Sequence, residues 1–349
     1  MRGIKGKVTI VTGGAGGIGA AICRRFADEG AIVAVFDINK DAAETIVADI
    51  RAKGGSAAAF GVDLTSQESV VAAVTAAEAQ LGPTDILVNN AGWDHAAPFL
   101  KTDKALWDKI VAVNLYGPLY MHHAVLKGMY ERGRGKVVNV ASDAARVGSS
   151  GEAVYAFCKG GLVAFSKTMA REVARKQITV NVVCPGPTDT ALFRDFAGEG
   201  ERGDKLRAAL ASAIPFRRLG QPEDVPGIVA FLASDEAAFV TAQALVVDGG
   251  RSEFVHEVRP AADRDAIGRN DLQPAFGKLD ELGRRQESGG AAGVHRMQQP
   301  ANQAHVVEQR QGGEDLRFRR CAEGGADRGA VVRQVGVTDR DTLGISGRA

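Results

Sequence analysis

The segment YAFCKGG, residues 155–161, places a phenol and an amine one helical turn apart. Lys159 is four positions after Tyr155, so on a helix the two share one face. The residues around them are small and apolar, and burying an unpaired ammonium there costs several kcal/mol. Lys159 therefore either reaches solvent or acts beside Tyr155. A neighbouring cation favours phenolate over phenol, whose pKa is ordinarily about 10, and such a pair suits general acid–base chemistry.

The elements that must position this pair alternate along residues 1–250. Apolar runs typical of strands are 7–12, 31–37, 57–63, 85–92, 135–142, 178–186 and 244–250. Helical spacing occurs over 20–30, 40–55, 69–82 and 154–176. The strands are apolar on both faces, as in a parallel sheet covered by helices. The sequence therefore predicts an α/β domain over 1–250 with a doubly wound, mostly parallel sheet, the Rossmann fold.

A glycine-rich stretch, TGGAGGIG at residues 12–19, joins the first strand to the first helix. Glycine there permits a tight turn and lets backbone N–H groups approach a pyrophosphate. The candidate cofactor-binding residues in this stretch are Thr12, Gly13, Gly17, Ile18 and Gly19.

Acidic and amide residues end the next three strands. Asp37 ends the second strand, where a carboxylate accepts hydrogen bonds from ribose hydroxyls and repels a 2′-phosphate, which favours NAD over NADP. Asp63 ends the third strand, where it either accepts a hydrogen bond from the adenine amino group or caps the following helix. In NNAG, Asn90 and Gly92 are placed beside the cofactor, and Asn89 braces neighbouring strands.

Six motifs together resemble the short-chain dehydrogenase/reductase family across residues 5–250: TGGAGGIG, NNAG, VNLYG, NVASDAA, Tyr155-x-x-x-Lys159 and PGPTDT. The resemblance implies that Tyr155 is the general acid/base and that Lys159 supports its phenolate and binds the nicotinamide ribose. It assigns Ser142 to the substrate oxygen and Asn114 to a water linking Lys159 to solvent. Taken singly, each of these residues also has a purely structural explanation.

The same resemblance extends to the segment after the sixth strand. It implies that Pro185, Gly186, Thr188 and Thr190 of PGPTDT contact the cofactor, the threonines at the nicotinamide carboxamide. Residues 191–215 are then a substrate lid, or else a mobile surface insertion.

Substrate-side stretches such as SDAARVGSSGEAVY resemble family members that oxidise a ring hydroxyl β to a CoA thioester. The resemblance implies an acyl-CoA substrate, with 2-hydroxycyclohexanecarboxyl-CoA as the first candidate. Open alternatives are a straight-chain 3-oxoacyl thioester reductase, another secondary-alcohol dehydrogenase, and an inactive NAD-binding scaffold. Substrate contacts are expected around Trp93–Asp94–His95, residues 143–150 and the lid. Within the second of these segments, Arg146 meets an anion or pairs with Asp143 or Glu152.

Composition changes sharply near residue 251. Residues 251–349 contain 15 Arg but one Lys, and 8 of the 13 Gln. Their apolar residues show no period, so we expect a low-order tail, or a segment read from a different frame of a GC-rich gene, which resequencing tests.

The remaining sequence features limit which kinds of partner the protein can have. A formal charge of +1 gives no field for nucleic acid or a membrane surface, and no apolar run of about 18 residues predicts a membrane span. Four cysteines lack metal or disulfide spacing, which indicates reduced thiols in a cytoplasm. Family resemblance implies a homotetramer, although Ala242 stands where the family usually has glycine.

Overall fold

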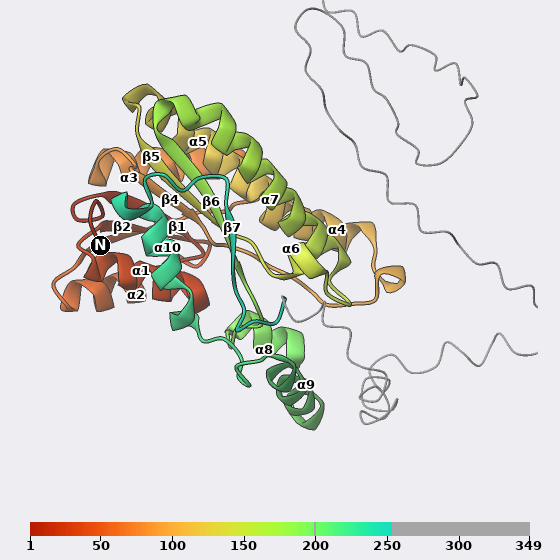
Figure 1. Cartoon of the computed structure of the whole chain (residues 1–349). Helices are drawn as coiled ribbons and strands as arrows, with labels where there is room; N and C mark the ends of the chain where they lie inside the picture. Colours follow the sequence, from red (N-terminus) through yellow and green to blue (C-terminus); the bar gives the residue numbers. More distant parts are fainter. Residues whose placement is uncertain (199, 253–349) are drawn as a thin grey trace, which may run out of the picture. The chain divides into compact units, whose positions relative to one another are not determined.

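The computed structural model describes residues 1–198 and 200–252, so the expectations for the tail, Arg251 and Ser252 apart, lie outside the described residues. Its core is a seven-stranded sheet in the order β3-β2-β1-β4-β5-β6-β7, and every pairing is parallel (Figure 1). This confirms the predicted doubly wound fold. The order reverses between β1 and β4, which places a crevice at the carboxyl ends of these strands.

The strands fall within or beside the predicted runs. They are β1 (Val8–Thr12), β2 (Ile32–Asp37), β3 (Ser56–Gly61), β4 (Ile86–Asn89), β5 (Gly135–Val140), β6 (Ile178–Pro185) and β7 (Ala244–Val247). The α-helices are α1 (Gly17–Asp28), α2 (Lys40–Ala52), α3 (Gln67–Leu81), α4 (Lys104–Val111), α5 (Gly117–Arg132), α6 (Ala144–Val147), α7 (Ala153–Val173), α8 (Ala191–Ala197), α9 (Gly200–Ala213) and α10 (Pro226–Ala233).

Helices cover both faces of the sheet. Apolar side chains of α1, α2 and α10 form one core layer, and those of α3, α5 and α7 form the other. Between them, β1 and β6 are buried along their whole length, which explains their lack of apolar–polar alternation. Among the described residues, no helix combines the length and the apolar character needed to cross a bilayer.

A buried polar cluster ties two strands to the α5–α7 layer. The Asn89 side-chain amide donates to Asn139 Oδ1 (2.9 Å), and the Asn139 amide donates to Ser166 Oγ (2.8 Å). The His122 Nδ1–H donates to the Pro118 carbonyl (2.7 Å), and Nε2 lies 3.3 Å from the Asn139 amide. Burial lowers the pKa of His122 to about 4. The network therefore contains a neutral imidazole, and Asn89 braces the strands as expected.

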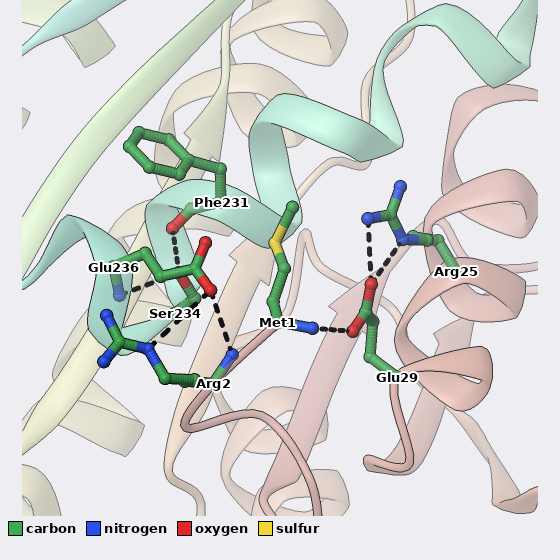
Figure 2. Close-up of polar contacts among 7 residues, drawn as sticks. All are labelled: Met1, Arg2, Arg25, Glu29, Phe231, Ser234 and Glu236. Atoms are coloured by element: carbon green, nitrogen blue, oxygen red, sulfur yellow. Dashed lines mark hydrogen bonds and ion pairs between the residues drawn. The ribbon is translucent and has the colours of Figure 1, made fainter.

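The segment before β1 is fastened at both sides (Figure 2). The Met1 amino group pairs with Glu29 at the end of α1, and Arg25 donates to the same carboxylate (3.0 Å). The Arg2 backbone N–H donates to Glu236 (3.3 Å), just after α10. These contacts hold the entry to β1 against α1 and the α10 end.

Ala242, which precedes β7, has a left-handed backbone with φ +60°. Its N–H donates to the Val180 carbonyl (2.9 Å), so this conformation starts the β6–β7 ladder. L-residues pay about 1–2 kcal/mol for such a backbone, and glycine does not. The departure from glycine noted in the sequence therefore falls at a position where glycine has a physical advantage.

Candidate active site

The loop between β1 and α1 needs glycine because of its backbone angles and because side chains would collide with neighbouring backbone. Gly13 and Gly17 have positive φ values, +64° and +52°. A Cβ at Gly19 would lie 1.9 Å from the Gly13 carbonyl oxygen, and one at Gly13 would lie 2.8 Å from Ala91 Cα. The loop thus folds tightly against the segment that follows β4.

Thr12 and Asn90 hold this loop in place through hydrogen bonds. The buried Thr12 hydroxyl accepts from the backbone N–H groups of Asn90 (3.0 Å) and Ala91 (3.1 Å). The Asn90 side chain donates to the carbonyls of Thr12 and Gly13. Gly13, Gly17, Ile18 and Asn90 line a cavity of about 610 Å³. Thr12 and Gly19 are not part of its wall, so the structure places them as supports of the loop.

Asp37 and Asp63 both line the cavity at the ends of β2 and β3. Asp37 accepts from the backbone N–H groups of Ala15 (3.0 Å) and Asn39 (2.9 Å). Asp63 accepts from the N–H and hydroxyl of Thr65. The cap of α3 is Ser66, whose hydroxyl accepts from the Ser69 N–H. Asp63 is therefore not the helix cap, the structural alternative considered from sequence.

Ser142, Tyr155 and Lys159 meet at the other end of the same cavity. Ser142 follows β5, and its hydroxyl accepts from the Ala144 N–H (3.1 Å). Lys159 is 2% exposed, donates to the Val140 carbonyl (3.1 Å), and lies 5.5 Å from the centroid of the Tyr155 ring. Lys159 is thus buried beside Tyr155 rather than extended into solvent.

Asn114 lies directly behind this group on a single π-helical turn, residues Ala112–Tyr116, between α4 and α5. Its side chain donates to the carbonyls of Trp93 (2.6 Å) and Ile110 (2.9 Å). A Cβ at Gly92 would lie 3.0 Å from Asn114 Oδ1 and 3.4 Å from Lys159 Nζ. Asn114 is fully buried and is not part of the cavity wall, and its hydrogen bonds hold the backbone at Trp93, next to Gly92 of the wall.

The charges at this end of the cavity oppose the expectation that a neighbouring cation favours the phenolate form of Tyr155. Burial raises the pKa of Tyr155, and the carboxyls of Glu152 and Asp94 raise it further, while a hydrogen bond from Ser142 lowers it. Burial also lowers the pKa of Lys159 to about 8. When no positively charged nicotinamide is bound, Tyr155 therefore keeps its proton at neutral pH, even though Lys159 lies next to it.

The end of β6 and the segment after it close the cavity from the opposite side. Pro185, Gly186, Thr188 and Thr190 all line it. The Thr188 hydroxyl donates to the Gly186 carbonyl (2.9 Å), and Thr190 caps α8. A Cβ at Gly17 would meet Thr190 Cγ2 at 3.2 Å, so the two loops touch. Residues of α8 and α9 complete this wall, where a lid was expected.

From sequence, two acidic groups of the cavity had only general expectations, Asp94 as a substrate contact and Glu152 as a possible partner of Arg146. Asp94 and Glu152 line the cavity beside Tyr155, and their positions in NNAGWD and SSGEAVY were the available signal. Asp143 pairs with Arg251, one residue past the predicted domain boundary, and also accepts from the Ser142 hydroxyl (3.3 Å). Arg251 was not anticipated because a partner 108 residues away leaves no local pattern.

Comparison with known proteins agrees with this geometry. The family described as enoyl-(acyl carrier protein) reductase matches residues 13–252. The chain is 39% identical to 2-(S)-hydroxypropyl-CoM dehydrogenase 3 of Xanthobacter autotrophicus, covering 71% of this chain and 97% of that protein. It is 38% identical to acetoacetyl-CoA reductase of Shinella zoogloeoides, covering 70% and 98%.

A solved structure is similar over the same region. It is 3-ketoacyl-(acyl-carrier-protein) reductase from Brucella melitensis complexed with NADH, with 33% identity, a TM-score of 0.65, and coverage of 71% and 99%. Fold, site and relatives agree, and the protein thus belongs to the short-chain dehydrogenase/reductase family, oxidoreductases that act on hydroxyl and carbonyl groups.

Proposed function

We propose that this protein oxidises, with NAD, a hydroxyl group β to a CoA thioester, and that its substrate is 2-hydroxycyclohexanecarboxyl-CoA. The observation that carries the proposal is the substrate end of the cavity. Ser142, Ser149, Glu152 and Tyr155 line it, and all belong to NVASDAARVGSSGEAVYA. That stretch resembles 2-hydroxycyclohexanecarboxyl-CoA dehydrogenase, an enzyme of anaerobic benzoate and alicyclic-acid degradation. Relatives named for acetoacetyl-CoA and hydroxypropyl-CoM support a thiol-linked substrate.

The residues at the loop end fit a dinucleotide. A backbone with no room for Cβ atoms at Gly13 and Gly19 allows close approach of a pyrophosphate to the start of α1. Asp37 ends β2 with its carboxylate on the cavity wall, where it would hold the ribose hydroxyls and disfavour a 2′-phosphate. A relative's structure is complexed with NADH. When bound, NAD supplies the hydride acceptor for the carbinol carbon.

The protein's own residues supply the proton chemistry. Ser142 would hold the substrate oxygen, and Tyr155 would take the proton from it. Because burial raises the pKa of Tyr155, the phenolate must be favoured by positive charge in the loaded site, from Lys159 and the nicotinamide ring. Asn114 keeps Gly92 and the segment at Trp93 in place against Lys159. The same groups in reverse protonate a carbonyl oxygen during reduction.

The test compares NAD reduction with 2-hydroxycyclohexanecarboxyl-CoA and with 3-hydroxybutyryl-CoA. We expect kcat/KM to favour the ring substrate about a hundredfold, equivalent to about 2.7 kcal/mol of transition-state discrimination. A preference for 3-hydroxybutyryl-CoA would replace the ring assignment by straight-chain 3-hydroxyacyl metabolism, the alternative that the 38% identity to acetoacetyl-CoA reductase favours. Turnover of simple alcohols or sugars alone would reject the thioester altogether.

A further inference from the structure

Arg251 lies on a tight turn that follows β7, and its side chain lines the cavity. The Asp248 carboxylate builds this turn by accepting from the backbone N–H groups of Gly250 (2.9 Å) and Ser252 (2.7 Å). Gly250 has a left-handed backbone, φ +89°, which glycine adopts without steric cost. Because β7 pairs in parallel with β6, the turn lies at the carboxyl ends of the strands. Contacts within the protein therefore bring the guanidinium of Arg251 to the cavity.

The Asp143 carboxylate lies between Arg251 and Ser142. Nη1 of Arg251 donates to Asp143 Oδ2, and the Ser142 hydroxyl lies 3.3 Å from Oδ1, to which it donates. Asp143 is 5% exposed, and its backbone N–H donates to the Pro185 carbonyl (2.9 Å), so the loop is fixed in this position. A hydrogen bond from a hydroxyl to a carboxylate is ordinarily about 2.5–2.7 Å long. The longer separation at Ser142 indicates that Asp143 holds this hydroxyl only weakly.

The Ser142 hydroxyl has one proton to donate. Its oxygen accepts from the Ala144 N–H (3.1 Å), so its own proton can go either to Asp143 or to the substrate oxygen. An ionised carboxylate is a stronger acceptor than a neutral oxygen. An unpaired Asp143 would therefore keep the proton that Ser142 needs in its proposed role. A guanidinium on the other carboxylate oxygen shares this charge and weakens the competing acceptor.

We propose that Arg251 is a positioning residue, which pairs with the Asp143 carboxylate and so leaves the Ser142 proton for the substrate oxygen. This inference rests on the proposed function, in the part that assigns Ser142 to that oxygen, and holds for any acyl group. The substrate oxygen gains negative charge as it gives its proton to Tyr155, so the hydrogen bond from Ser142 is strongest in the transition state. Loss of Arg251 therefore lowers kcat and changes KM little.

The experiment is a double-mutant cycle on Arg251 and Asp143, read in kcat and KM for the hydroxy substrate that is turned over fastest. Assays at pH 8 lie far above the ordinary pKa of a carboxyl, about 4. In Arg251→Met the carboxylate has lost its cation, so kcat should fall at least tenfold while KM stays within threefold. Asp143→Asn and the double variant have no carboxylate to compete for the proton, and both should keep kcat within threefold of the unmodified enzyme.

The cycle separates the proposed role from two others. If the pair only fastens the loop after β5, Asp143→Asn falls as far as Arg251→Met and the double variant does not recover. If Arg251 instead contacts the substrate, its replacement raises KM, and Asp143→Asn does not restore it. Either result overturns the inference. Should Arg251→Met not fold, Arg251→Gln removes the charge with a smaller loss of polarity and takes its place in the cycle.

Two further variants complete the test. Arg24→Met breaks an ion pair of 2.6 Å with Asp49, between α1 and α2 and outside the cavity wall, and should leave kcat unchanged. Ser142→Ala tests the proposed function separately. If it keeps full kcat, Ser142 does not hold the substrate oxygen, and both proposals fail at this residue. If it loses kcat while the Arg251–Asp143 cycle shows no recovery, the role of Ser142 stands and only the inference about Arg251 is wrong.

Discussion

At the scale of single residues, the structure separates the side chains that we propose react, which line the cavity, from those that support them. Tyr155, Ser142 and Lys159 line the cavity, whereas Thr12, Gly19 and Asn114 lie behind its wall. The sequence motifs do not make this distinction, because a supporting residue is constrained as tightly as a reacting one. A Cβ at Gly19 is excluded by the Gly13 carbonyl, not by a ligand.

Removing the phenol oxygen tests whether the protein is an enzyme or an NAD-binding scaffold. In Tyr155→Phe the proposed general acid/base is lost while the ring and Lys159 remain, so kcat/KM should fall about 10²–10⁴-fold. NAD affinity, measured by fluorescence titration, should change less than threefold. Equal turnover by the variant would show that Tyr155 does not transfer the proton. As a control, Tyr130→Phe, on an exposed part of α5, should leave both values unchanged.

Asp37 provides the test of cofactor choice. In Asp37→Asn the negative charge at the end of β2 is removed with little change of shape, so repulsion of a 2′-phosphate weakens. The ratio of kcat/KM for NAD to that for NADP should fall at least tenfold, about 1.4 kcal/mol. Asp63→Asn, on the same cavity wall at the end of β3, should weaken both cofactors alike and leave the ratio unchanged. An unaltered ratio in Asp37→Asn would assign selectivity to another residue.

At the scale of elements, the parallel sheet was readable because its strands are short apolar runs joined by helices of ordinary length. The helices α4 and α5 were not predicted, since the π-helical turn at Ala112–Tyr116 interrupts the 3.6-residue period between them. The segment 191–215 gave only an expectation of a lid, and the structure divides it into α8 and α9. Local pattern fails where a helix changes its period or where glycine and charge outnumber apolar residues.

The buried His122 ties β5 to α5 and makes stability depend on pH. Its pKa is about 4 in the folded chain against about 6.5 when unfolded, so the unfolded state binds the proton first. Its contribution is complete above pH 6.5 and is lost as pH falls toward 4. The loss is on the order of 3 kcal/mol. Urea unfolding should show a smaller pH dependence over this window in His122→Gln than in the unmodified protein or in His123→Gln, an exposed neighbour.

Replacing Ala242, the residue with a left-handed backbone before β7, by glycine should raise the stability of the protein. Ala242→Gly relieves a backbone cost of about 1–2 kcal/mol and adds some unfolded-state entropy, so unfolding free energy should rise by roughly 0.5–1 kcal/mol. The control Ala238→Gly, at a right-handed φ of −59°, should lower it. Thermal unfolding at fixed protein concentration measures both. A destabilised Ala242→Gly would mean that the methyl group contributes packing worth more than the strain.

At the scale of the whole molecule, the boundary of the folded domain is the least predictable feature. The composition shift placed it at residue 250, yet Arg251 lines the cavity and pairs with Asp143, and the Ser252 N–H donates to Asp248 (2.7 Å). Composition averages over many residues and does not register a single ion pair. The loop after β5 that carries Ser142 and Asp143 is thus held by a residue that the sequence assigned to the tail.

Two truncated chains test this dependence. A chain ending at Ser252 keeps the Arg251–Asp143 pair and should be at least as active as the full chain, as expected if 253–349 adds nothing to catalysis. A chain ending at Gly250 leaves Asp143, which is 5% exposed, without its cation. Breaking a buried pair costs up to about 3 kcal/mol, and Asp143 also accepts from the Ser142 hydroxyl, so both Tm and kcat should fall. Arg251→Met in the longer chain should reproduce the loss. Equal activity of the two truncated chains would restore the boundary at residue 250, and lower activity of the chain ending at Ser252 than of the full chain would assign a role to the residues beyond it.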